Sequence, residues 1–337
     1  MAGKIIVTGG TGYIGSHTTI ELFNQGFEVV IIDDLSNSKE EMLDRIEKIS
    51  GKRPIFYHTD LKDKNAVAEI FRAHEISAVI HFAASKAVGE SVEKPLFYYK
   101  NNLLGIINLL ECMTDNNVGS FIFSSSCTVY GQPDELPVTE NSPIKVAASP
   151  YGNTKQIGEE IISDTMAVTE NMNAISLRYF NPIGAHDSGL IGELPQGIPN
   201  NLIPYLLKVA AGELEKLSVF GDDYDTTDGT AVRDYIHVVD LAKAHVIALK
   251  RLLEKKNTSR YEVFNLGTGT GYTVLEIIKG FEKVTGTPLN YVISPRRPGD
   301  VEKIYADTNL ANSVLGWKAE RGLDNMLETA WKWQCNM

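Results

Sequence analysis

The first 180 residues alternate short apolar runs with amphipathic stretches, and no other feature restricts the fold as strongly. Six runs are almost continuously apolar, which is typical of parallel strands covered on both faces. They are KIIVTGG, EVVIIDD, PIFYHTD, AVIHFAA, GSFIFSSS and NAISLRYFN. The stretches at 12–25, 64–74, 97–115 and 152–170 have the pattern of helices. Repeated strand–helix–strand units predict an α/β fold with a doubly wound parallel sheet.

The pattern becomes looser after residue 181. NPIGAHDSGLIGELPQGIPNN is rich in Gly, Pro and Asn and predicts a long functional loop. LIPYLLKVAAGE and VVDLAKAHVIALKRLLEK predict helices, and LSVFGDD predicts a strand. We therefore expect a first domain at 1–180 and a smaller, mixed α/β substrate domain at 181–337. The run YEVFNLG predicts a late strand near 261–266 that returns to the first domain.

Composition excludes several classes of partner. The net charge of −11 and the pI near 5.2 argue against nucleic acid and anionic membranes. No apolar run approaches the roughly 20 residues of a membrane span, and MAGK leads directly into a strand without a signal peptide. Cys112, Cys127 and Cys335 are far apart and form no C-x-x-C, which indicates a reducing compartment and no zinc framework. We expect a cytoplasmic protein without a metal.

A glycine-rich loop, VTGGTGYIGS, follows the first strand and opens the first helix. Gly9, Gly12 and Gly15 allow the tight turn and close backbone approach that a pyrophosphate needs, and the helix N-terminus supplies N–H groups. A simple strand-to-helix turn would use glycines too. The next strand, however, ends in Asp33, 18 residues beyond Gly15. This context indicates dinucleotide binding on a Rossmann sheet.

Asp33 also predicts which dinucleotide is bound. A carboxylate there accepts hydrogen bonds from the ribose hydroxyls and repels a 2′-phosphate, so we expect NAD and not NADP. Asp34 adds a second negative charge, and no arginine occurs before Arg45. Asp60, after the third strand, either holds the adenine edge or caps the following helix.

SPYGNTK places Tyr151 and Lys155 one helical turn apart. A nearby ammonium and a positive nicotinamide ring both favour the phenolate, so we expect a lowered pKa for Tyr151. A surface Tyr/Lys pair is the alternative. The serine run at 124–126 decides against it, because ligands bind beyond the carboxyl ends of parallel strands. Ser126 is expected to contact the same substrate oxygen, and Ser124 to cap the strand end.

The glycine loop, the serine and the Y-x-x-x-K pair resemble the extended short-chain dehydrogenases/reductases. Further motifs narrow the resemblance to the UDP-glucose 4-epimerase family. They are GGTGYIGSH, KAVGES, SSSCTVYG, YGNTK, RYFNPIGAH, GIPNNLIPY, FGDDYDTTDGT, VRDYIHVVDLA and RRPGD, and they run in this order from residue 9 to residue 300.

The resemblance implies reversible epimerisation of UDP-galactose and UDP-glucose at carbon 4, in galactose metabolism. Tyr151 would be the base, Ser126 its hydroxyl partner, and Lys155 the group that tunes the phenol and holds NAD. Hydride would pass to tightly bound NAD, and a 4-keto sugar, anchored by its diphosphate, would turn over before reduction. The family forms homodimers through two helices per subunit, here about 97–113 and 152–168.

The resemblance also assigns binding residues. The NAD contacts would be Gly9, Gly12, Tyr13, Ile14, Gly15, Asp33, Asn37, Ser38, Asp60, Leu61, Phe82, Ala83, Lys86, Asn101, Ser124, Tyr151, Lys155 and Tyr179. The UDP-sugar contacts would be Lys86, Ser126, Tyr151, Asn181, Asn201, Leu202, Phe220, Arg233, Tyr235, Arg297, Asp300 and Ile304. Arg233 and Arg297 would be two buried cations that neutralise the diphosphate, although Arg297 could also be a solvated surface cation. Asp300 would bind the uridine ribose. Phe220 lies beside the uracil or in the core.

Ile304 bears on substrate range. A bulky residue at this position of the family crowds the sugar 2-substituent, so we expect poor use of UDP-GlcNAc; a UDP-GlcNAc 4-epimerase is one alternative. A second is an NAD-dependent sugar-nucleotide 4,6-dehydratase, which needs an acid pair where this chain has Cys127, Thr128 and Val129. A third is an NAD-sensing binding protein, which would have lost the catalytic trio. Cys127 replaces a usual alanine, and we expect a small buried thiol there.

Overall fold

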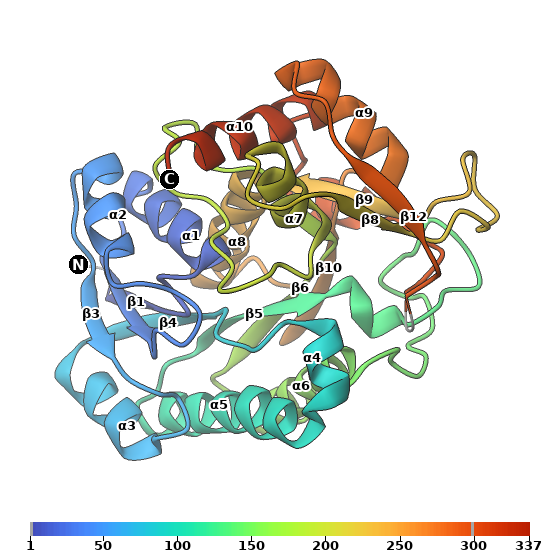
Figure 1. Cartoon of the computed structure of the whole chain (residues 1–337). Helices are drawn as coiled ribbons and strands as arrows, with labels where there is room; N and C mark the ends of the chain where they lie inside the picture. The colour runs from blue at the N-terminus through green and yellow to red at the C-terminus, as the bar shows by residue number, and fades with distance from the viewer. Residues whose placement is uncertain (1–2, 298–299) are drawn as a thin grey trace.

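The computed structural model describes residues 3–297 and 300–337. Its centre is a seven-stranded sheet of order β10-β6-β5-β4-β1-β2-β3, in which all neighbours are parallel (Figure 1). The strands are β1 (Lys4–Thr8), β2 (Val29–Asp33), β3 (Ile55–His58), β4 (Ile76–His81), β5 (Ser120–Ser126), β6 (Asn173–Tyr179) and β10 (Tyr261–Leu266). The predicted doubly wound α/β fold is therefore confirmed.

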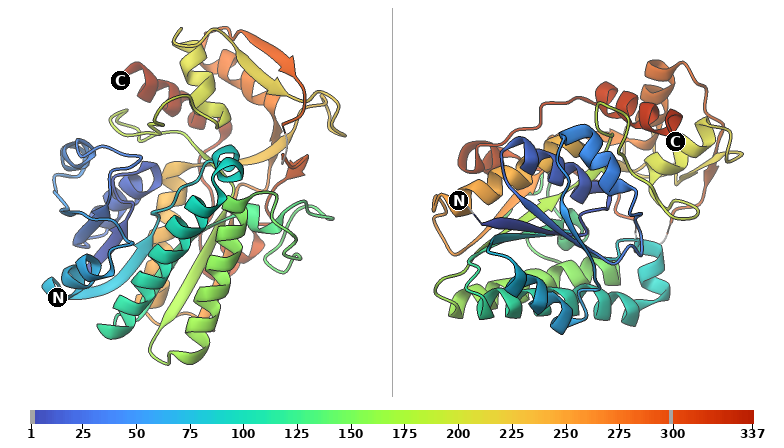
Figure 2. Two further views of the ribbon diagram at one scale, coloured as in Figure 1. Left: turned by 60° about the horizontal axis from the view of Figure 1, so that its bottom comes forward. Right: turned by 90° about the vertical axis from the view of Figure 1, so that its left-hand side faces the viewer.

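Helices cover both faces of this sheet (Figure 2). One face carries α1 (Tyr13–Asn24), α2 (Met42–Ser50) and α8 (Val238–Leu253), and the other carries α3 (Lys64–Ala73), α5 (Pro95–Asp115) and α6 (Pro150–Val168). Successive side chains of a strand point to opposite faces. Ile5 and Val7 accordingly pack into one core and Ile6 into the other, which explains why the strands are apolar throughout.

Two elements from late in the chain complete the first half. β10 pairs with β6 at the edge of the sheet, where Tyr261 lies opposite Ala174. α8 packs beside α1, and its Leu241 and Leu249 share a core with Ile20 of α1. The chain therefore returns to the first half after residue 180, and Leu315 and Trp317 also pack into its core.

A smaller lobe holds the remaining elements. β9 (Val232–His237) pairs with β7 (Asn181–Ile183), β11 (Gly271–Thr273) and β13 (Lys303–Ile304), and β8 (Leu217–Phe220) pairs with β12 (Tyr291–Ser294). Its helices are α7 (Leu202–Ala210), α9 (Val274–Thr285) and α10 (Leu323–Cys335). Leu206, Phe281 and Leu327 form part of a separate core between them.

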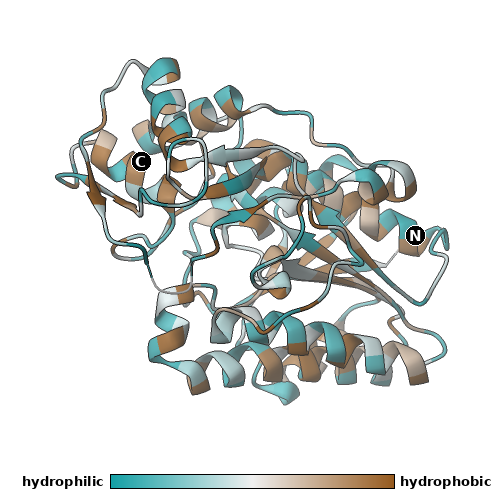
Figure 3. Ribbon diagram, turned by 90° about the vertical axis from the view of Figure 1, so that its right-hand side faces the viewer, coloured by the Kyte–Doolittle hydropathy of each residue, from teal (hydrophilic) through white to brown (hydrophobic). Residues whose placement is uncertain are grey.

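Short elements finish the fold: α4 (Val88–Glu93), the 3₁₀ turn η1 (Cys127–Tyr130) and the π turn η2 (Ala311–Leu315). Most helices alternate between apolar and polar residues along their length, because only one side faces a core (Figure 3). Across residues 3–297 and 300–337, no helix combines the length and the apolar character that crossing a bilayer requires.

Candidate active site

The carboxyl ends of β1, β2, β4, β5 and β6 lie along one edge of the sheet, because these strands are parallel neighbours. This edge gathers most of the NAD-binding and catalytic residues predicted from the sequence. The same edge faces the start of α6 and the loop that leads into α7. The site is therefore built where ligands bind in open parallel sheets.

The glycine loop makes its turn without room for side chains. Gly9 has φ +68°, and a Cβ there would lie 2.8 Å from the backbone nitrogen of Ala83. A Cβ on Gly15 would lie 2.2 Å from the carbonyl oxygen of Gly9. Gly12 is the N-cap of α1 and offers no side chain to the first-turn N–H groups. These donors stay available for an anion.

Asp33 is held at the end of β2 by the loop around it. One carboxylate oxygen accepts from the Leu35 N–H at 2.9 Å and from the Ser38 hydroxyl at 3.0 Å, and the other accepts from the Thr11 N–H at 3.1 Å. Thr11 was not predicted, although it lies between two of the loop glycines. Asn37 is exposed.

The Asp60 carboxylate accepts from the Lys62 N–H at 2.8 Å and pairs with the Lys62 ammonium at 2.9 Å. The same ammonium donates to Asn101 at 2.7 Å. The N-cap of α3 is Asp63, which accepts from the Ala66 N–H, so Asp60 does not cap that helix. The capping alternative for Asp60 is wrong because the helix begins three residues later.

Four predicted apolar contacts lie around this edge. Ile14, on α1, and Phe82, after β4, are partly buried, and the Phe82 ring centre lies 4.6 Å from that of His245. Leu61 is buried and its carbonyl accepts from Asn108 at 2.8 Å. Ala83 follows Phe82, with its N–H 3.4 Å from the Thr8 hydroxyl.

A buried asparagine next to Asn101 was missed. The side chain of Asn102 accepts from the Ser85 N–H at 2.9 Å and donates to Thr154, beside Lys155, at 3.0 Å. This bond joins the loop after β4 to α6. The Asn–Asn pair that opens the apolar stretch NNLLGIINLL was the signal available in the sequence.

The catalytic trio meets at the start of α6. Ser149 caps the helix by accepting from the Gly152 N–H at 3.2 Å, which places Tyr151 in the first turn. The Lys155 ammonium donates to the Ser124 carbonyl at 2.7 Å and lies 5.9 Å from the Tyr151 ring centre. Ser126 ends β5, and its hydroxyl accepts from the Thr128 N–H at 3.2 Å. All three are at most 9% exposed.

Burial dominates the electrostatics of these groups. It raises the pKa of Tyr151 well above its usual value, and Ser126 offsets only part of that effect. Burial also lowers the pKa of Lys155 to about 8, although Glu159 counteracts it. The expectation that the protein's own ammonium lowers the pKa of Tyr151 is therefore wrong, because desolvation of the phenolate costs more than the ammonium contributes.

Neighbouring groups stay neutral for the same reason. Burial raises the pKa of Tyr179 to about 12, and its hydroxyl forms a short hydrogen bond with Ser124. Ser124 thus binds a side chain rather than capping the strand. Burial raises the pKa of Cys127 to about 12, as expected for an inert buried thiol.

The two halves of the chain meet over the first turn of α1. The Tyr13 hydroxyl donates to the Gly184 carbonyl at 2.6 Å. The Lys86 ammonium lies 2.8 Å from the Glu193 carboxylate, which also accepts from Asn201 at 3.4 Å. The sequence had not suggested Glu193, an acid in the long loop.

The predicted UDP residues gather on β7, β9 and nearby loops. Asn181 lies opposite Tyr235 between β7 and β9, and Arg233 lies opposite Ile304 between β9 and β13. Leu202 begins α7. These positions share one small sheet, so its register fixes their spacing.

Asp300 lies between the two arginines. It accepts from Arg297 at 2.8 and 3.1 Å, and its carboxylate is 3.9 Å from Arg233. The expectation of two buried arginines is wrong: the Arg297 side chain is 42% exposed because it lies on a surface loop, whereas Arg233 is 17% exposed. Phe220 is 39% exposed, with the Arg297 guanidinium 5.6 Å from its ring centre, so it is not a core residue.

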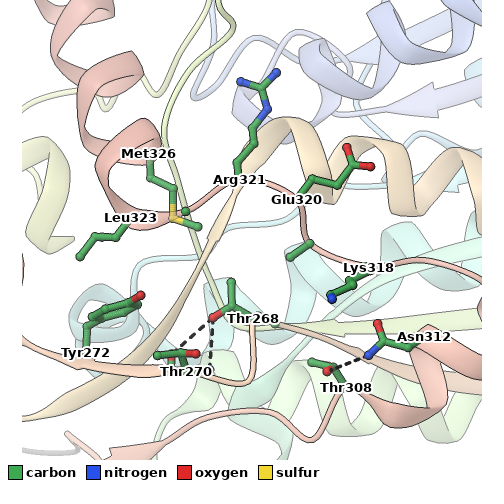
Figure 4. A pocket seen from close by; sticks show the side chains of 13 residues that line it. Thr268, Thr270, Tyr272, Thr308, Asn312, Lys318, Glu320, Arg321, Leu323 and Met326 are labelled. Atoms are coloured by element: carbon green, nitrogen blue, oxygen red, sulfur yellow. Dashed lines mark hydrogen bonds between the residues drawn. The ribbon is translucent and has the colours of Figure 1, made fainter.

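A cavity of about 240 Å³ lies apart from this site (Figure 4). Thr268, Lys318 and Met326 line it, and none of the predicted site residues does. Asp234 on β9 anchors one wall by accepting from the Thr268 N–H at 2.8 Å. Neighbours on a strand point to opposite faces, so Asp234 points away from Arg233 and Tyr235. Within the described ranges, no three His, Cys, Asp or Glu side chains are grouped to hold a metal ion.

Known proteins are similar to this chain over almost its whole length. A family model described as GDP-mannose 4,6 dehydratase matches residues 6–330. The UDP-glucose 4-epimerase of Bacillus subtilis is 54% identical over 330 residues, which cover 98% of this chain and 96% of that protein. The chain belongs to the UDP-glucose 4-epimerase family. This result confirms the family inferred from the motifs, within the extended short-chain dehydrogenases/reductases.

Solved structures of UDP-glucose 4-epimerases share the fold closely. The enzyme of Bifidobacterium longum, in complex with NAD⁺ and UDP, has a TM-score of 0.95 and 50% identity, covering 99% of this chain and 98% of that one. The enzyme of Stenotrophomonas maltophila, with bound NAD and formylated UDP-arabinopyranose, has a TM-score of 0.96 and 48% identity, with coverage of 99% and 98%.

Proposed function

We propose that this chain interconverts UDP-galactose and UDP-glucose at carbon 4 of the sugar, with NAD as its resident cofactor. One observation carries the proposal. Tyr151, Lys155 and Ser126 converge at the carboxyl edge of a dinucleotide-binding sheet, in a chain 54% identical to a UDP-glucose 4-epimerase.

The residues present fit NAD. The glycine loop leaves a cradle that any Cβ on Gly9 or Gly15 would fill, and α1 presents uncapped N–H groups to it. Asp33 is ordered by three donors at the point where the adenine ribose of a bound dinucleotide lies in such sheets. Its charge disfavours a 2′-phosphate, which supports NAD over NADP.

The chemistry follows from the positions of three side chains. Bound NAD would supply the acceptor and donor of the hydride at sugar carbon 4, and its positive charge would favour the Tyr151 phenolate. Tyr151 takes the proton of the 4-hydroxyl and gives it back, so the pKa of this buried phenol must match that of the sugar oxygen in its site. Ser126 lowers the pKa of the same phenol, against the larger effect of burial. Lys155, fixed by the Ser124 carbonyl, supplies an ammonium below pH 8.

Epimerisation also requires that the sugar presents either face while the nucleotide stays in place. Arg233, held by the Val232 carbonyl at 2.8 Å, gives a fixed cation for the diphosphate. Arg297 is more exposed and reaches the site from the loop that carries Asp300. We propose that Asp300 exchanges its contacts with Arg297 for the uridine ribose when UDP binds.

The test incubates the purified protein with UDP-galactose, adds no cofactor, and looks for UDP-glucose by chromatography. We expect product from a sample that carries NAD, and none from Tyr151→Phe, which keeps the ring and removes the hydroxyl. A sample that retains NAD and forms no UDP-glucose would contradict the proposal.

The dehydratase alternative has one supporting observation, the description of the matching family model. The residues at its required acid positions argue against it. Cys127 is buried with a raised pKa, Val129 is fully buried, and neither it nor Thr128 is an acid. Mass spectrometry of the same reaction distinguishes the two, because a dehydratase product is lighter than its substrate by one water.

Three finer proposals accompany this function. We propose that Ile304 restricts the sugar 2-substituent, that the chain forms a homodimer through α5 and α6, and that it works in the cytoplasm. Ile304 is 4% exposed and packs in a cluster with Cys127, Tyr130 and Phe180. The thiols Cys112, Cys127 and Cys335 are free, which accords with a reducing compartment.

A further inference from the structure

A buried ionic network stands behind the catalytic helix, and the proposed mechanism does not use it. Glu159 follows Lys155 by one turn of α6, so Tyr151, Lys155 and Glu159 share one helix face at intervals of four residues. The Glu159 and Arg178 side chains are 10% and 7% exposed. Buried charges of this kind are costly unless fully paired.

The pairing of Glu159 is complete. Arg178 on β6 donates from Nη2 to Oε2 at 2.6 Å and from Nε to Oε1 at 2.9 Å. The Ser125 hydroxyl on β5 donates to Oε1 at 2.5 Å. The carboxylate thus ties α6 to two strands of the sheet, and Ser125 stands between the two serines of the active site.

Arg178 is fixed from its far side as well. Its Nη1 donates to the Tyr130 hydroxyl at 3.0 Å and to the Glu140 carbonyl at 3.2 Å. The Tyr130 hydroxyl in turn donates to Asn265 on β10 at 2.6 Å. Because every member has a partner, the network holds one geometry.

Lys155 itself has no carboxylate within 4 Å in the part of the chain that the structure describes. The groups that face it are His81 from β4, Ser124 from β5, and Tyr151 and Glu159 from its own helix. Tyr179 from β6 contacts Ser124 and acts on Tyr151. Burial lowers the pKa of His81 to about 3 and raises that of Tyr179 to about 12, so both are neutral near pH 8.

The phenol that faces Glu159 adds no negative charge of its own. It is Tyr261 on β10, which is buried and has a raised pKa. Glu159 is therefore the negative charge that acts on Lys155.

We propose that Glu159 is a positioning residue for the epimerase reaction: through Arg178 and Ser125 it sets α6 against the sheet, and its charge keeps Lys155 an ammonium. This inference rests on the proposed function, because the ammonium matters only if Tyr151 exchanges a proton. The Glu159–Arg178 pair would then influence the protonation of Lys155 as well as the packing of α6.

The test compares pH–rate profiles of the NAD-loaded wild type and Glu159→Gln, which keeps the shape and removes the charge. We expect the alkaline limb of kcat, near pH 8 in the wild type, to move about one pH unit lower in the variant. The ratio of wild-type kcat to variant kcat should then be about tenfold larger at pH 9 than at low pH. The KM for UDP-galactose should change little. Ser125→Ala, which removes a hydrogen bond and no charge, is the matched control and should keep the limb in place.

A second readout does not depend on activity. The unfolding free energy of Glu159→Gln relative to the wild type is measured in urea at pH 7, 8 and 9. The destabilisation should shrink as Lys155 loses its proton, because the favourable Glu159–Lys155 interaction is then absent from both proteins. If Glu159→Gln is insoluble, the double variant Glu159→Gln/Arg178→Met removes both buried charges and should still show the lower alkaline limb.

The outcomes separate cleanly. A rate loss in Glu159→Gln that is equal at all pH values, or an equal shift in Ser125→Ala, overturns the inference. A destabilisation that does not depend on pH also overturns it. An inactive wild type instead contradicts the proposed function, and the urea measurement then decides this inference alone.

Discussion

At the scale of single residues, the site is governed by desolvation. Tyr151 and Lys155 are both buried, and burial displaces the pKa of each toward its neutral form. The ammonium survives near neutral pH because Ser124 accepts its hydrogen bond and Glu159 lies one turn away. Because its pKa is raised, Tyr151 needs the positive charge that bound NAD would add before it can accept a proton readily.

The buried lysine predicts a pH-dependent stability. Its folded pKa of about 8 lies below the value of about 10.4 for an unfolded lysine. Between these two pKa values the unfolded chain binds more protons than the folded protein. The free energy of unfolding therefore increases as pH rises, by at most about 3 kcal/mol. Urea unfolding at pH 8, 9 and 10 should show a steeper gain in the wild type than in Lys155→Met. If the free energy of unfolding rises equally with pH in both proteins, the lowered pKa of Lys155 is wrong.

Ile304 predicts a change of specificity. Ile304→Ala removes a branched side chain beside the small sheet that carries Arg233. We expect turnover of UDP-GlcNAc to rise while that of UDP-galactose persists, and stability to fall by about 2–5 kcal/mol through the cavity left in the cluster. Product analysis with each nucleotide sugar checks the first effect. Unchanged UDP-GlcNAc turnover in a folded variant would place the restriction elsewhere.

At the scale of elements, the start of α6 aims the chemistry. Ser149 caps the helix, Pro150 occupies its first turn, and Tyr151 follows at once. Pro is favoured there because it needs no N–H partner. The start of α6 therefore determines the position of the Tyr151 phenol. That position depends on one capping side chain, Ser149.

Removing that cap should therefore cost activity as well as stability. For Ser149→Ala we expect a loss of about 1 kcal/mol in the free energy of unfolding and a fall in kcat, since the first turn frays around Tyr151. The control is Thr273→Ala, which removes the capping box of α9, a helix that carries none of the predicted site residues. It should lose similar stability and keep kcat. Steady-state kinetics and urea unfolding of both variants check this, and an equal kcat in all three proteins would refute it.

At the scale of the whole molecule, one feature of the surface stands out. The helical layer formed by α5 and α6 exposes apolar side chains, with Leu96 81% and Phe97 51% exposed at the start of α5. The exposed apolar residues Ile107, on α5, and Val168, at the end of α6, lie on the same two helices. These are the helices by which we propose that two copies associate.

A charge on this layer should prevent association. Phe97→Lys is expected to shift the protein from dimer to monomer in light scattering after gel filtration, because an unpaired ammonium is costly to bury. Val146→Lys changes an equally apolar residue, 92% exposed in the loop before α6, and should leave the dimer intact. A wild-type protein that is monomeric at micromolar concentration would contradict the proposed homodimer.

Several errors of sequence-based inference have one cause. The acid that caps α3 is Asp63 and not Asp60, because capping depends on the first helical residue, which periodicity locates only approximately. Arg297 is exposed and Tyr151 has a raised pKa, because exposure and desolvation are properties of the packed chain. Asn102 and Glu193 have no motif of their own, and they gain roles only through partners at 154 and 86.

The sequence by itself determined the sheet, its dinucleotide loop, the choice of NAD and the family. These follow from local patterns: apolar runs, glycine spacing, a carboxylate at a strand end, and motifs in order. The return of β10 to the first half was also predicted from its apolar run, and the structure confirms it. Only the tertiary structure decided how α8 returns to the first half, and how Glu159, Arg178 and Ser125 meet behind Lys155. The physical reason is that buried charge and long-range pairing depend on distances between residues far apart in the chain, which no local pattern encodes.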